Sequence, residues 1–435
     1  MDALRIQGGA RLSGTLPIDG SKNAALPAMA AAILSQGTVQ LHDIPTLSDI
    51  GNMTKLLREL GCEVTGQGRN CTIRTIDATA NHARYEIVRT MRASICVLGP
   101  LLAARGEARV SMPGGCAIGD RPVDLHLRGL EALGATIELD GGDIIARADR
   151  LKGTTIFLGG PFGSTVLGTA NVMSAATLAE GRTIIESAAC EPEITGLADM
   201  LNAMGAKISG AGTPRIEIEG VESLGEVEYT IIPDRIIAGT LAMAVAMTNG
   251  DATLTNFPHD NLLAVLDRLN VAGVHVRRTD LTQDPRRCTV QVTSERRLNP
   301  VLYTTQPYPG FPTDLQAQMM SLLCLAQGNS IVTERIYPDR FLHVSELTRM
   351  GATLFRSGPT VVVQGGGQLV GAPVMAGDLR GSAALVMAGL VARGETIVQR
   401  IYHLDRGYVR LEEQLNKLGA GIERFELGVS DPIGV

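Results

Sequence analysis

A short sequence motif with the same pattern of apolar and polar residues occurs six times along this chain. In each copy an amphipathic helical stretch ends on a glycine and runs into an alternating segment, as in LLRELGCEV and QLNKLGAGI. Apolar residues three and four positions apart predict a helix before the glycine, and alternation predicts a strand after it. The glycines recur at steps of 73, 71, 68, 78 and 68 residues, at Gly61, Gly134, Gly205, Gly273, Gly351 and Gly419. Such a period indicates six stacked structural repeats.

A second glycine closes an Ala/Leu/Met-rich stretch ahead of each motif. These glycines are Gly37, Gly106, Gly181, Gly250, Gly328 and Gly394. Stretches such as 24–34 and 383–391 are apolar on nearly every face, which is typical of buried helices. Each repeat therefore predicts a buried helix, a strand, an amphipathic helix and a further strand or hairpin. The second repeat is longer, and its extra residues fall in PGGCAIG, where an insertion predicts a solvent-facing loop with chemistry.

The repeats predict an α/β protein of two domains. A chain of 435 residues with 45% hydrophobic content is too long for one core, and six repeats divide into three and three. Helices inside and sheets outside would give each domain threefold internal symmetry. We expect one domain over residues 21–229 and another over 1–20 plus 230–435, because the first residues resemble strands that complete a sheet of the second. The cleft between two such lobes is the expected ligand site.

Charge and cysteine content narrow the class of protein. The formal net charge of −6 comes from 39 basic and 45 acidic residues without a long run of one sign, which argues against non-specific binding of nucleic acid or membrane. Seven cysteines without close pairing or metal-like spacing suit a reducing compartment. No signal peptide or membrane span is evident, so we expect a soluble cytoplasmic protein.

Two cations lead predicted buried helices. Lys22 and Asn23 stand in DGSKNAALPAM, where unsatisfied N–H groups at a helix start can help a lysine to hold an anion. From these residues alone, a surface lysine beside a capping serine is the favoured interpretation. Arg92 leads the apolar segment ASICVLGPLLAA, and its guanidinium needs either a ligand anion or an internal carboxylate.

The segment PGGCAIGDRPVDLH carries the strongest local signal. Glycines flank Cys116 on both sides and predict a mobile loop, while Arg121 supplies positive potential nearby. A thiol beside a cation has a lowered pKa and becomes a nucleophile or a proton carrier. The other six cysteines lie in apolar or strand contexts, where we expect them to fill space. Residues 122–126 fit either a set of backbone groups around a flat ring or an ordinary helix start.

Three further residues suggest a site for anions. Asp314 in PYPGFPTDLQAQ is placed at a helix N-cap, and a carboxylate held there would also suit a general base. Arg380 and Arg406 precede helices in corresponding loops, and ion pairs with the neighbouring Asp378 and Asp405 are the alternative to ligand binding. Five cations near helix starts in a net acidic protein favour a polyanionic substrate: Lys22, Arg92, Arg121, Arg380 and Arg406.

Motifs spread from residue 21 to 410 resemble a known family. SKNAALP, TMRAS, PGGCAIGDRPVDLH, AATLAEGRTIIE, EPEI, FPTDLQAQ, RFLHVSELTRMGA and RIYHLDRGY are similar to the UDP-N-acetylglucosamine 1-carboxyvinyltransferases of the EPSP synthase superfamily. The resemblance implies an inside-out α/β barrel of two domains. It also implies transfer of the enolpyruvyl group of phosphoenolpyruvate to the 3-hydroxyl of UDP-N-acetylglucosamine, which releases phosphate and begins peptidoglycan synthesis. No metal or organic cofactor is implied, and protein partners are not specified.

The resemblance assigns roles by matching position. Lys22, Arg121 and Arg406 correspond to groups that bind phosphoenolpyruvate, with Asn23 at the sugar. Cys116 corresponds to the loop cysteine that adds to C2 of phosphoenolpyruvate and donates a proton, and Asp314 to the base near the sugar hydroxyl. Nucleotide-sugar contacts correspond to Arg92, Arg121, Pro122, Val123, Asp124, Leu125 and Ile336.

Three departures from the family pattern affect the acceptor. Where the family has a lysine ahead of Ser-Val-Gly-Ala-Thr against the diphosphate, this chain has Gly163, Ser164, Thr165 and Val166. Ile237 replaces an acid and Cys190 replaces an arginine. The alternative is therefore an enolpyruvyl transferase that acts on another uridine nucleotide, such as UMP.

Two other classes are disfavoured. An inactive nucleotide-sugar-binding repeat protein would be expected to lack the chemical residues, yet Cys116, Asp314 and Lys22 are all present. The shikimate-pathway enolpyruvyl transferase lacks the PGGC loop.

Overall fold

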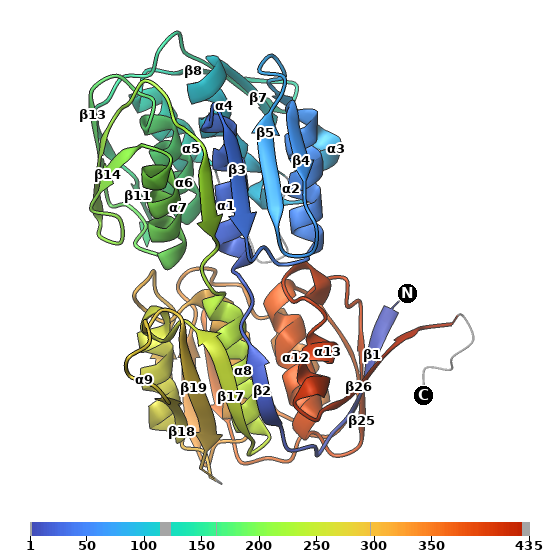
Figure 1. Ribbon diagram of the computed structural model, residues 1–435. Coiled ribbons are helices and arrows are strands. Elements are labelled where there is room, and N and C mark those ends of the chain that lie inside the picture. The colour runs from blue at the N-terminus through green and yellow to red at the C-terminus, as the bar shows by residue number, and fades with distance from the viewer. Residues whose placement is uncertain (1, 114–122, 162, 296, 429–435) are drawn as a thin grey trace. The chain divides into compact units, whose positions relative to one another are not determined.

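The chain forms two compact units, each built from three repeats. A computed structural model describes residues 2–113, 123–161, 163–295 and 297–428 (Figure 1). The N unit contains residues 20–113 and 123–232, and the C unit contains residues 2–19 and 233–428. The described chain passes from one unit to the other at residues 19–20 and again at 232–233.

In the N unit, three buried helices form the core, and three amphipathic helices pack beside them. The buried helices are α1 (Lys22–Ala31), α4 (Leu98–Arg105) and α6 (Val166–Ala176). The amphipathic helices are α2 (Ser48–Glu59), α5 (Asp124–Ala132) and α7 (Pro192–Ala203). Shorter helical turns are η1 (Ala32–Leu34), α3 (Tyr85–Val88) and η2 (Arg92–Val97). Helix α6 contacts both α1 and α4, so the three buried helices share one hydrophobic core.

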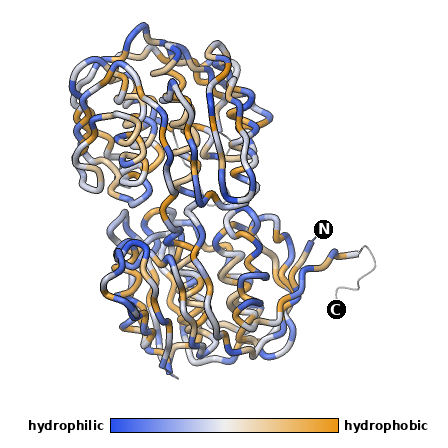
Figure 2. Tube along the Cα trace, in the orientation of Figure 1, coloured by the Kyte–Doolittle hydropathy of each residue, from blue (hydrophilic) through white to orange (hydrophobic). Residues whose placement is uncertain are grey.

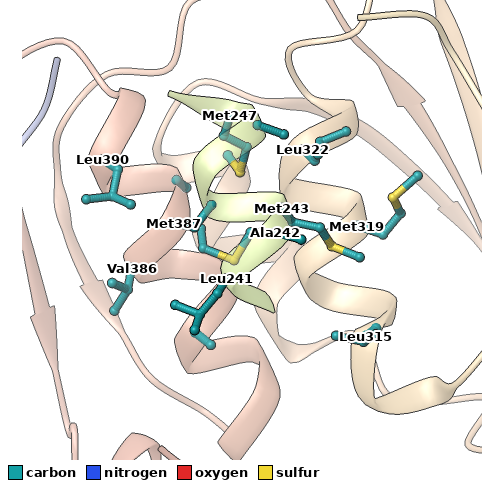
Figure 3. Packing of buried hydrophobic residues seen from close by; sticks show 14 of the residues in the cluster. Leu241, Ala242, Met243, Met247, Leu315, Met319, Leu322, Val386, Met387 and Leu390 are labelled. Atoms are coloured by element: carbon teal, nitrogen blue, oxygen red, sulfur yellow. The ribbon is translucent and has the colours of Figure 1, made fainter. Parts of the chain in front are cut away.

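The C unit repeats this plan. Its buried helices are α8 (Arg235–Met247), α10 (Gln316–Leu323) and α12 (Leu379–Val391), and its amphipathic helices are α9 (Leu263–Ala272), α11 (Leu342–Arg349) and α13 (Leu411–Lys417). Figure 3 shows methionines and leucines of α8 packed between α10 and α12, where Met243 lies near Met319. Every residue of α8 is buried, as the all-round apolar pattern predicts. None of the described helices has the length and apolar character that a transmembrane segment requires.

The sheets of both units follow one strand order. Each has a leading strand parallel to the strand after the buried helix, and then two antiparallel strands. The N-unit sheets are β16–β3–β5–β4 (Val227–Thr230, Thr38–His42, Cys71–Thr75, Cys62–Thr65), β6–β7–β9–β8 (His82–Ala83, Glu107–Ser111, Asp143–Arg147, Thr136–Asp140) and β10–β13–β15–β14 (Thr155–Phe157, Arg182–Glu186, Arg215–Glu219, Lys207–Ser209). The C-unit sheets are β2–β17–β19–β18 (Ser13–Pro17, Asp251–Phe257, Cys288–Ser294, Val274–Arg278), β20–β21–β23–β22 (Leu302–Thr304, Asn329–Thr333, Thr360–Gln364, Thr353–Ser357) and β24–β25–β1–β26 (Pro373–Met375, Glu395–Gln399, Asp2–Gln7, Gly421–Glu426).

Strands distant in sequence complete three of these sheets. Strand β16 follows the third repeat yet pairs with β3 of the first. Strand β1 lies between β25 and β26, and β2 pairs with β17. Hydrophobic and hydrophilic residues alternate along the strands (Figure 2). The six sheets of equal strand order confirm the predicted fold class of six α/β repeats, three in each half.

The repeat period is set by how the amphipathic helices end. All six glycines of the repeated motif have φ between 74° and 108°, a left-handed conformation that strains any residue with a Cβ. A left-handed residue just past a helix allows the last carbonyls to be satisfied and turns the chain into the next strand. Glycine therefore recurs because the backbone conformation at this position requires it.

Candidate active site

Lys22 forms a buried ion pair at the start of α1. Ser21 caps the helix by accepting a hydrogen bond from the Ala24 N–H, as the capping interpretation predicted. The lysine is not a surface residue, however, because its side chain is only 8% exposed. Its Nζ lies 3.1 Å from Oδ2 of Asp49, whose side chain is 4% exposed. Asn23 is the next residue of the helix and is half-buried.

Asp49 suits this position because it stands in the first turn of α2. The N-terminus of a helix favours a carboxylate and disfavours an ammonium. Lys22, the first residue of α1, is therefore held against the local dipole by the charge of Asp49. Sequence reasoning missed Asp49, since an acid in the first turn of an amphipathic helix usually faces solvent.

Asp314 lies between two buried arginines of the C unit. Its Oδ1 accepts a hydrogen bond of 2.7 Å from Arg340 Nη1. Its Oδ2 accepts bonds of 3.1 and 2.9 Å from Nε and Nη2 of Arg380. The arginine side chains are 5% and 1% exposed, whereas Asp314 keeps 26% exposure. Asp314 is thus more exposed than the two arginines that it pairs with.

The predicted capping role of Asp314 is wrong. The N-cap of the short turn η4 (Thr313–Leu315) is Pro312, and no side chain caps it. Leu315 occupies the N-cap of α10. A buried arginine without a carboxylate is far more costly than an uncapped turn, and this difference explains why the Asp314 side chain faces Arg340 and Arg380.

The arginines fix the ionisation of Asp314. Burial alone would raise the pKa of this carboxyl, but the charges of Arg380 and Arg340, with their hydrogen bonds, hold it far below its usual range. Asp314 is therefore an anion throughout the neutral pH range and a weak base while both arginines contact it.

Glu334 and Asp378 frame the arginine cluster. Glu334 is fully buried and accepts hydrogen bonds from Thr305 and Thr313 at 2.7 and 2.9 Å. It also accepts the backbone N–H of Ile336 at 2.8 Å, which fixes the loop that carries Arg340. Asp378 caps α12 through the Gly381 N–H and lies 3.6 Å from Nε of Arg340. The alternative of an Arg380–Asp378 ion pair is wrong, because Arg380 pairs with Asp314, while Asp378 caps the helix and pairs with Arg340.

Arg406 ends the short turn η5 (Leu404–Arg406) and is half-buried. The neighbouring Asp405 accepts hydrogen bonds of 2.9 and 2.6 Å from Arg424 on β26. This bidentate pair anchors the turn to the last sheet of the C unit.

The N unit presents further predicted residues at helix starts. Val123 is the N-cap of α5, and Asp124 and Leu125 form its first turn. Arg92 begins η2, a turn of 3₁₀ helix that precedes α4, whereas the sequence predicted one continuous helix. His126 is buried on α5, with Nδ1 2.9 Å from the amide of Asn171 on α6.

Residues 163–166, which depart from the family pattern, form part of a two-stranded ribbon and the start of a helix. Gly163 and Ser164 make up β12, which pairs with β11 (Gly159–Gly160). Thr165 caps α6 through a 3.2 Å bond from the Gly168 N–H, and Val166 begins that helix. Ile237 is fully buried in α8, so this departure fills the core.

The six described cysteines are poor nucleophiles. Burial raises the pKa of Cys96 and Cys324 to about 12 and that of Cys71 to about 11. Burial also raises the pKa of Cys62, Cys190 and Cys288. Four of the six are buried and two are half-buried, in keeping with a packing role. Cys116, Arg121 and Pro122 lie outside the described residues.

Known proteins are similar in sequence to this chain over nearly its whole length. The EPSP synthase (3-phosphoshikimate 1-carboxyvinyltransferase) family model matches residues 6–415. A UDP-N-acetylglucosamine 1-carboxyvinyltransferase of Nitratidesulfovibrio vulgaris is 52% identical over 427 residues, which are 98% of this chain and 99% of that protein. The chain belongs to the UDP-N-acetylglucosamine 1-carboxyvinyltransferase family. A second protein of that name, from Desulfosudis oleivorans, is 50% identical over 98% of this chain and 99% of its own length.

A solved structure with a similar fold comes from outside this carboxyvinyltransferase group. The enolpyruvyl transferase NikO from Streptomyces tendae has a TM-score of 0.86 and 25% identity over 97% of this chain and 98% of its own. Identity to the carboxyvinyltransferases is thus about twice the identity to NikO.

Proposed function

We propose that this protein transfers the enolpyruvyl group of phosphoenolpyruvate to the 3-hydroxyl of UDP-N-acetylglucosamine and releases phosphate. The observation that carries the proposal is 52% identity over 98% of the chain to a protein of that activity. The reaction is the first committed step of peptidoglycan synthesis, and we place it in the cytoplasm. The alternative of an inactive nucleotide-sugar-binding protein receives no support, because Lys22 and Asp314 are both present and each is held in an ion pair.

The reaction divides into an addition and an elimination. Protonation of C3 of phosphoenolpyruvate by the Cys116 thiol leaves a cationic C2. The sugar oxygen bonds to C2 and loses its proton, which gives a tetrahedral ketal. A proton then leaves C3 while the C2–O bond to phosphate breaks, so the vinyl group is regenerated and phosphate departs. The phosphate and carboxylate groups of phosphoenolpyruvate remain anionic through both steps, and Lys22, Arg121 and Arg406 hold them.

Asp314 accepts the proton of the sugar hydroxyl. A strongly paired carboxylate is a weak base, yet a weak base is enough here, because bonding to the cationic C2 makes the hydroxyl proton strongly acidic. The Asp314 side chain keeps 26% exposure although both of its oxygens bond the buried arginines, so part of it is open to a bound sugar. Arg340 and Arg380 act through Asp314 and are positioning residues.

Nucleotide-sugar contacts are proposed for the helix starts of the N unit. Backbone N–H groups at the beginning of α5 and α6 favour phosphate oxygens. The residues proposed for these contacts and for the sugar are Asn23, Arg92, Arg121, Pro122, Val123, Asp124, Leu125, Gly163, Ser164, Thr165, Val166 and Ile336.

A uridine nucleotide without the sugar remains the second candidate acceptor. The observation that favours it is the missing lysine at Gly163, together with a NikO-like fold. Twofold higher identity to the carboxyvinyltransferases favours UDP-N-acetylglucosamine.

A phosphate-release assay tests the two acceptors. The protein is mixed with phosphoenolpyruvate and either UDP-N-acetylglucosamine or UMP, and the Cys116→Ala variant serves as the control for contaminating phosphatase. We expect release with UDP-N-acetylglucosamine alone, and loss of release in the variant. Turnover on UMP that exceeds turnover on the nucleotide sugar would overturn the assignment.

A further inference from the structure

Three polar side chains meet inside the apolar core of the C unit. Gln318 lies on α10, Thr240 lies on α8, and Tyr408 follows η5 by two residues. Their exposed fractions are 0%, 1% and 1%. The Nε2 atom of Gln318 lies 3.0 Å from Oη of Tyr408 and 3.1 Å from Oγ1 of Thr240, and these two oxygens are 3.1 Å apart. We call Gln318, Thr240 and Tyr408 the buried polar cluster.

The repeat itself does not require polar residues at this place. Gln318 and Thr240 stand ten positions before Gly328 and Gly250, the glycines that close their apolar stretches. The same position in the other four repeats is also buried and is occupied by Pro27, Cys96, Asn171 and Ala384. Proline and alanine side chains form no hydrogen bonds, so the core of such a unit can be built without them. The buried polar cluster therefore needs a separate cause.

The hydrogen bonds of the cluster have one consistent direction. Thr240 donates its proton to the carbonyl of Ile236 at 2.8 Å, so it accepts from its other neighbours. The single proton of Tyr408 then goes to Thr240, which leaves the lone pairs of Tyr408 for an amide N–H of Gln318. The other N–H of Gln318 is donated to the backbone carbonyl of Asp314 at 2.9 Å. The reverse orientation of the Gln318 amide would set its oxygen against that carbonyl, so the cluster fixes this side chain in one orientation.

Tyr408 connects the cluster to the carboxylate of Asp314. The centre of its ring lies 5.3 Å from Cζ of Arg380, a distance at which a guanidinium and an aromatic ring attract each other. Arg380 in turn donates to Oδ2 of Asp314 through Nε and Nη2. Asp314 is therefore held at its carbonyl by Gln318 and at its carboxylate by Arg380. Tyr408 contacts both of these residues.

We propose that Gln318 and Tyr408 are positioning residues for Asp314, an inference that rests on the proposed enolpyruvyl transfer. Among the described residues, no side chain caps the turn η4 in which Asp314 stands, so its backbone position depends on other contacts. A general base must lie within about 3 Å of the proton that it accepts, and a misplacement of about 1 Å can lower the rate roughly 100-fold. Gln318 holds the backbone of Asp314 from the interior, and Tyr408 holds the arginine that its carboxylate contacts.

Steady-state kinetics of phosphate release test the inference on the full chain. Gln318→Met keeps most of the side-chain volume but removes both amide hydrogens, and Tyr408→Phe removes only the hydroxyl. We expect kcat to fall roughly 10–100-fold in Gln318→Met, because both the carbonyl contact and the contact with Tyr408 are lost. We expect a fall of roughly threefold to tenfold in Tyr408→Phe, which keeps its ring beside Arg380. Neither KM should change by more than about twofold, because neither residue is proposed to touch substrate.

Ser321→Ala is the matched control. Ser321 is a fully buried residue of α10, and its hydroxyl donates to the carbonyl of Ala384 on α12 at 2.9 Å. The control loses a buried hydroxyl, as Tyr408→Phe does, but the lost bond does not involve the buried polar cluster. Its kcat should stay near the wild-type value.

Combination with Asp314→Asn separates positioning from a general effect on the fold. If Gln318 acts through Asp314, then Gln318→Met should lower kcat by less than about a further twofold once the base has been removed. A merely structural role would lower kcat by the same factor in both backgrounds. Alkylation of Cys116 by fosfomycin gives a second readout. It requires no base for the sugar hydroxyl, so its rate should be unchanged in Gln318→Met and Tyr408→Phe.

The wild type is assayed first with both UDP-N-acetylglucosamine and UMP, and the acceptor that it turns over is used throughout. A wrong acceptor assignment is then recognised from the wild type alone and does not imitate a failure of the inference. Wild-type kcat in both Gln318→Met and Tyr408→Phe, or an equal loss with and without Asp314→Asn, would overturn the inference. If Gln318→Met does not fold, Tyr408→Phe is taken through the same combination and decides the question.

Discussion

The buried charges of the two units differ in how they are paired and how far they are exposed. In the N unit, Lys22 and Asp49 form an ion pair of 3.1 Å, and both side chains are more than nine-tenths buried. In the C unit, Asp314 keeps 26% exposure above Arg340 and Arg380, which are almost fully buried. The N unit thus holds Lys22 against the acid Asp49, whereas the C unit holds Asp314 between two cations.

This difference suits two chemical tasks. In the proposed reaction Lys22 binds an anion and benefits from a fixed position, which its ion pair with Asp49 provides. In the proposed reaction Asp314 takes up a proton for a short time and must stay ionised between turnovers, and the charges of the two arginines lower its pKa. Breaking a buried pair by removing one partner costs about 3–5 kcal/mol, so each arrangement is expected to respond strongly to a single substitution.

The largest effect is expected for Asp314→Asn. Asparagine keeps the shape but removes the proton acceptor, and general base catalysis contributes about 10²–10⁴ in rate. We expect kcat to fall by that order, with a smaller change in the KM of either substrate. Asp339→Asn is the control, because this acid of the neighbouring loop is 86% exposed and pairs with Arg356 at the surface. Wild-type turnover in Asp314→Asn would leave the residue a purely structural role.

The same variant has a pH signature. Asp314 has a depressed pKa in the folded state, so its stabilising effect is present above the unfolded value near 4 and is lost as pH falls toward the folded value. The stability gap between wild type and Asp314→Asn should therefore be constant from about pH 5 to 7 and shrink below about pH 4. Urea unfolding at several pH values measures the gap.

Thiol reactivity should separate Cys116 from the other six cysteines. Thiols with a pKa of about 11 or 12 are almost wholly protonated at pH 8. Alkylation at Cys116 should therefore be at least about 100-fold faster. Fosfomycin, an epoxide that resembles phosphoenolpyruvate, should add once, at Cys116, and faster when UDP-N-acetylglucosamine is bound. Peptide mapping that finds the adduct at Cys71 or Cys190, the half-buried thiols, would contradict this expectation.

Asp49→Asn tests the N-unit pair. It leaves the Lys22 ammonium buried without the charge of Asp49, so the lysine should hold phosphoenolpyruvate less well oriented. We expect the KM for phosphoenolpyruvate to rise roughly tenfold, with a much smaller change for UDP-N-acetylglucosamine. Glu228→Gln is the control, because this acid is 72% exposed and pairs with His42 at the surface of the same unit. Equal changes in both KM values would indicate general loss of structure instead.

The smallest effect is expected from adding a cation to the N unit. The family has a lysine where this chain has Gly163, but Gly163 has φ of 102°, which a lysine adopts only with strain. Ser164→Lys adds the charge one residue later, and we expect up to about tenfold tighter binding of UDP-N-acetylglucosamine at low salt. Gly163→Lys should give less. Calorimetric titrations at two salt concentrations compare the variants, and no gain from either would exclude this segment from the diphosphate contacts.

Most of the fold could be predicted from local patterns. The six glycines mark helix ends with φ above 70°, a requirement that shows directly in sequence. The partner of β16 could not be predicted, because alternation along a strand does not specify its neighbour, and this strand pairs with β3 about 190 residues earlier. The inner place of β1 between β25 and β26 was hidden for the same reason.

Only the site residues that stand in recognisable sequence motifs could be predicted. Lys22 and Asp314 stand in distinctive segments, but Asp49 and Arg340 were missed because their burial arises from tertiary packing. From the sequence alone, an acid at the start of an amphipathic helix and an arginine in a loop are both expected to be exposed to solvent. The N-cap prediction for Asp314 failed because local helix chemistry was outweighed by the need to neutralise two buried arginines.

The place of β1 has a consequence for how the chain is made. Arg5 and Glu423 pair although they are 418 positions apart. At a synthesis rate of about 5–20 residues per second, β1 leaves the ribosome roughly 20 to 80 s before its partners β25 and β26 exist. The N unit, in contrast, can close once β16 emerges. During that interval β1 has unsatisfied edges on both sides, so translation itself gives this protein a period in which chaperone protection matters most.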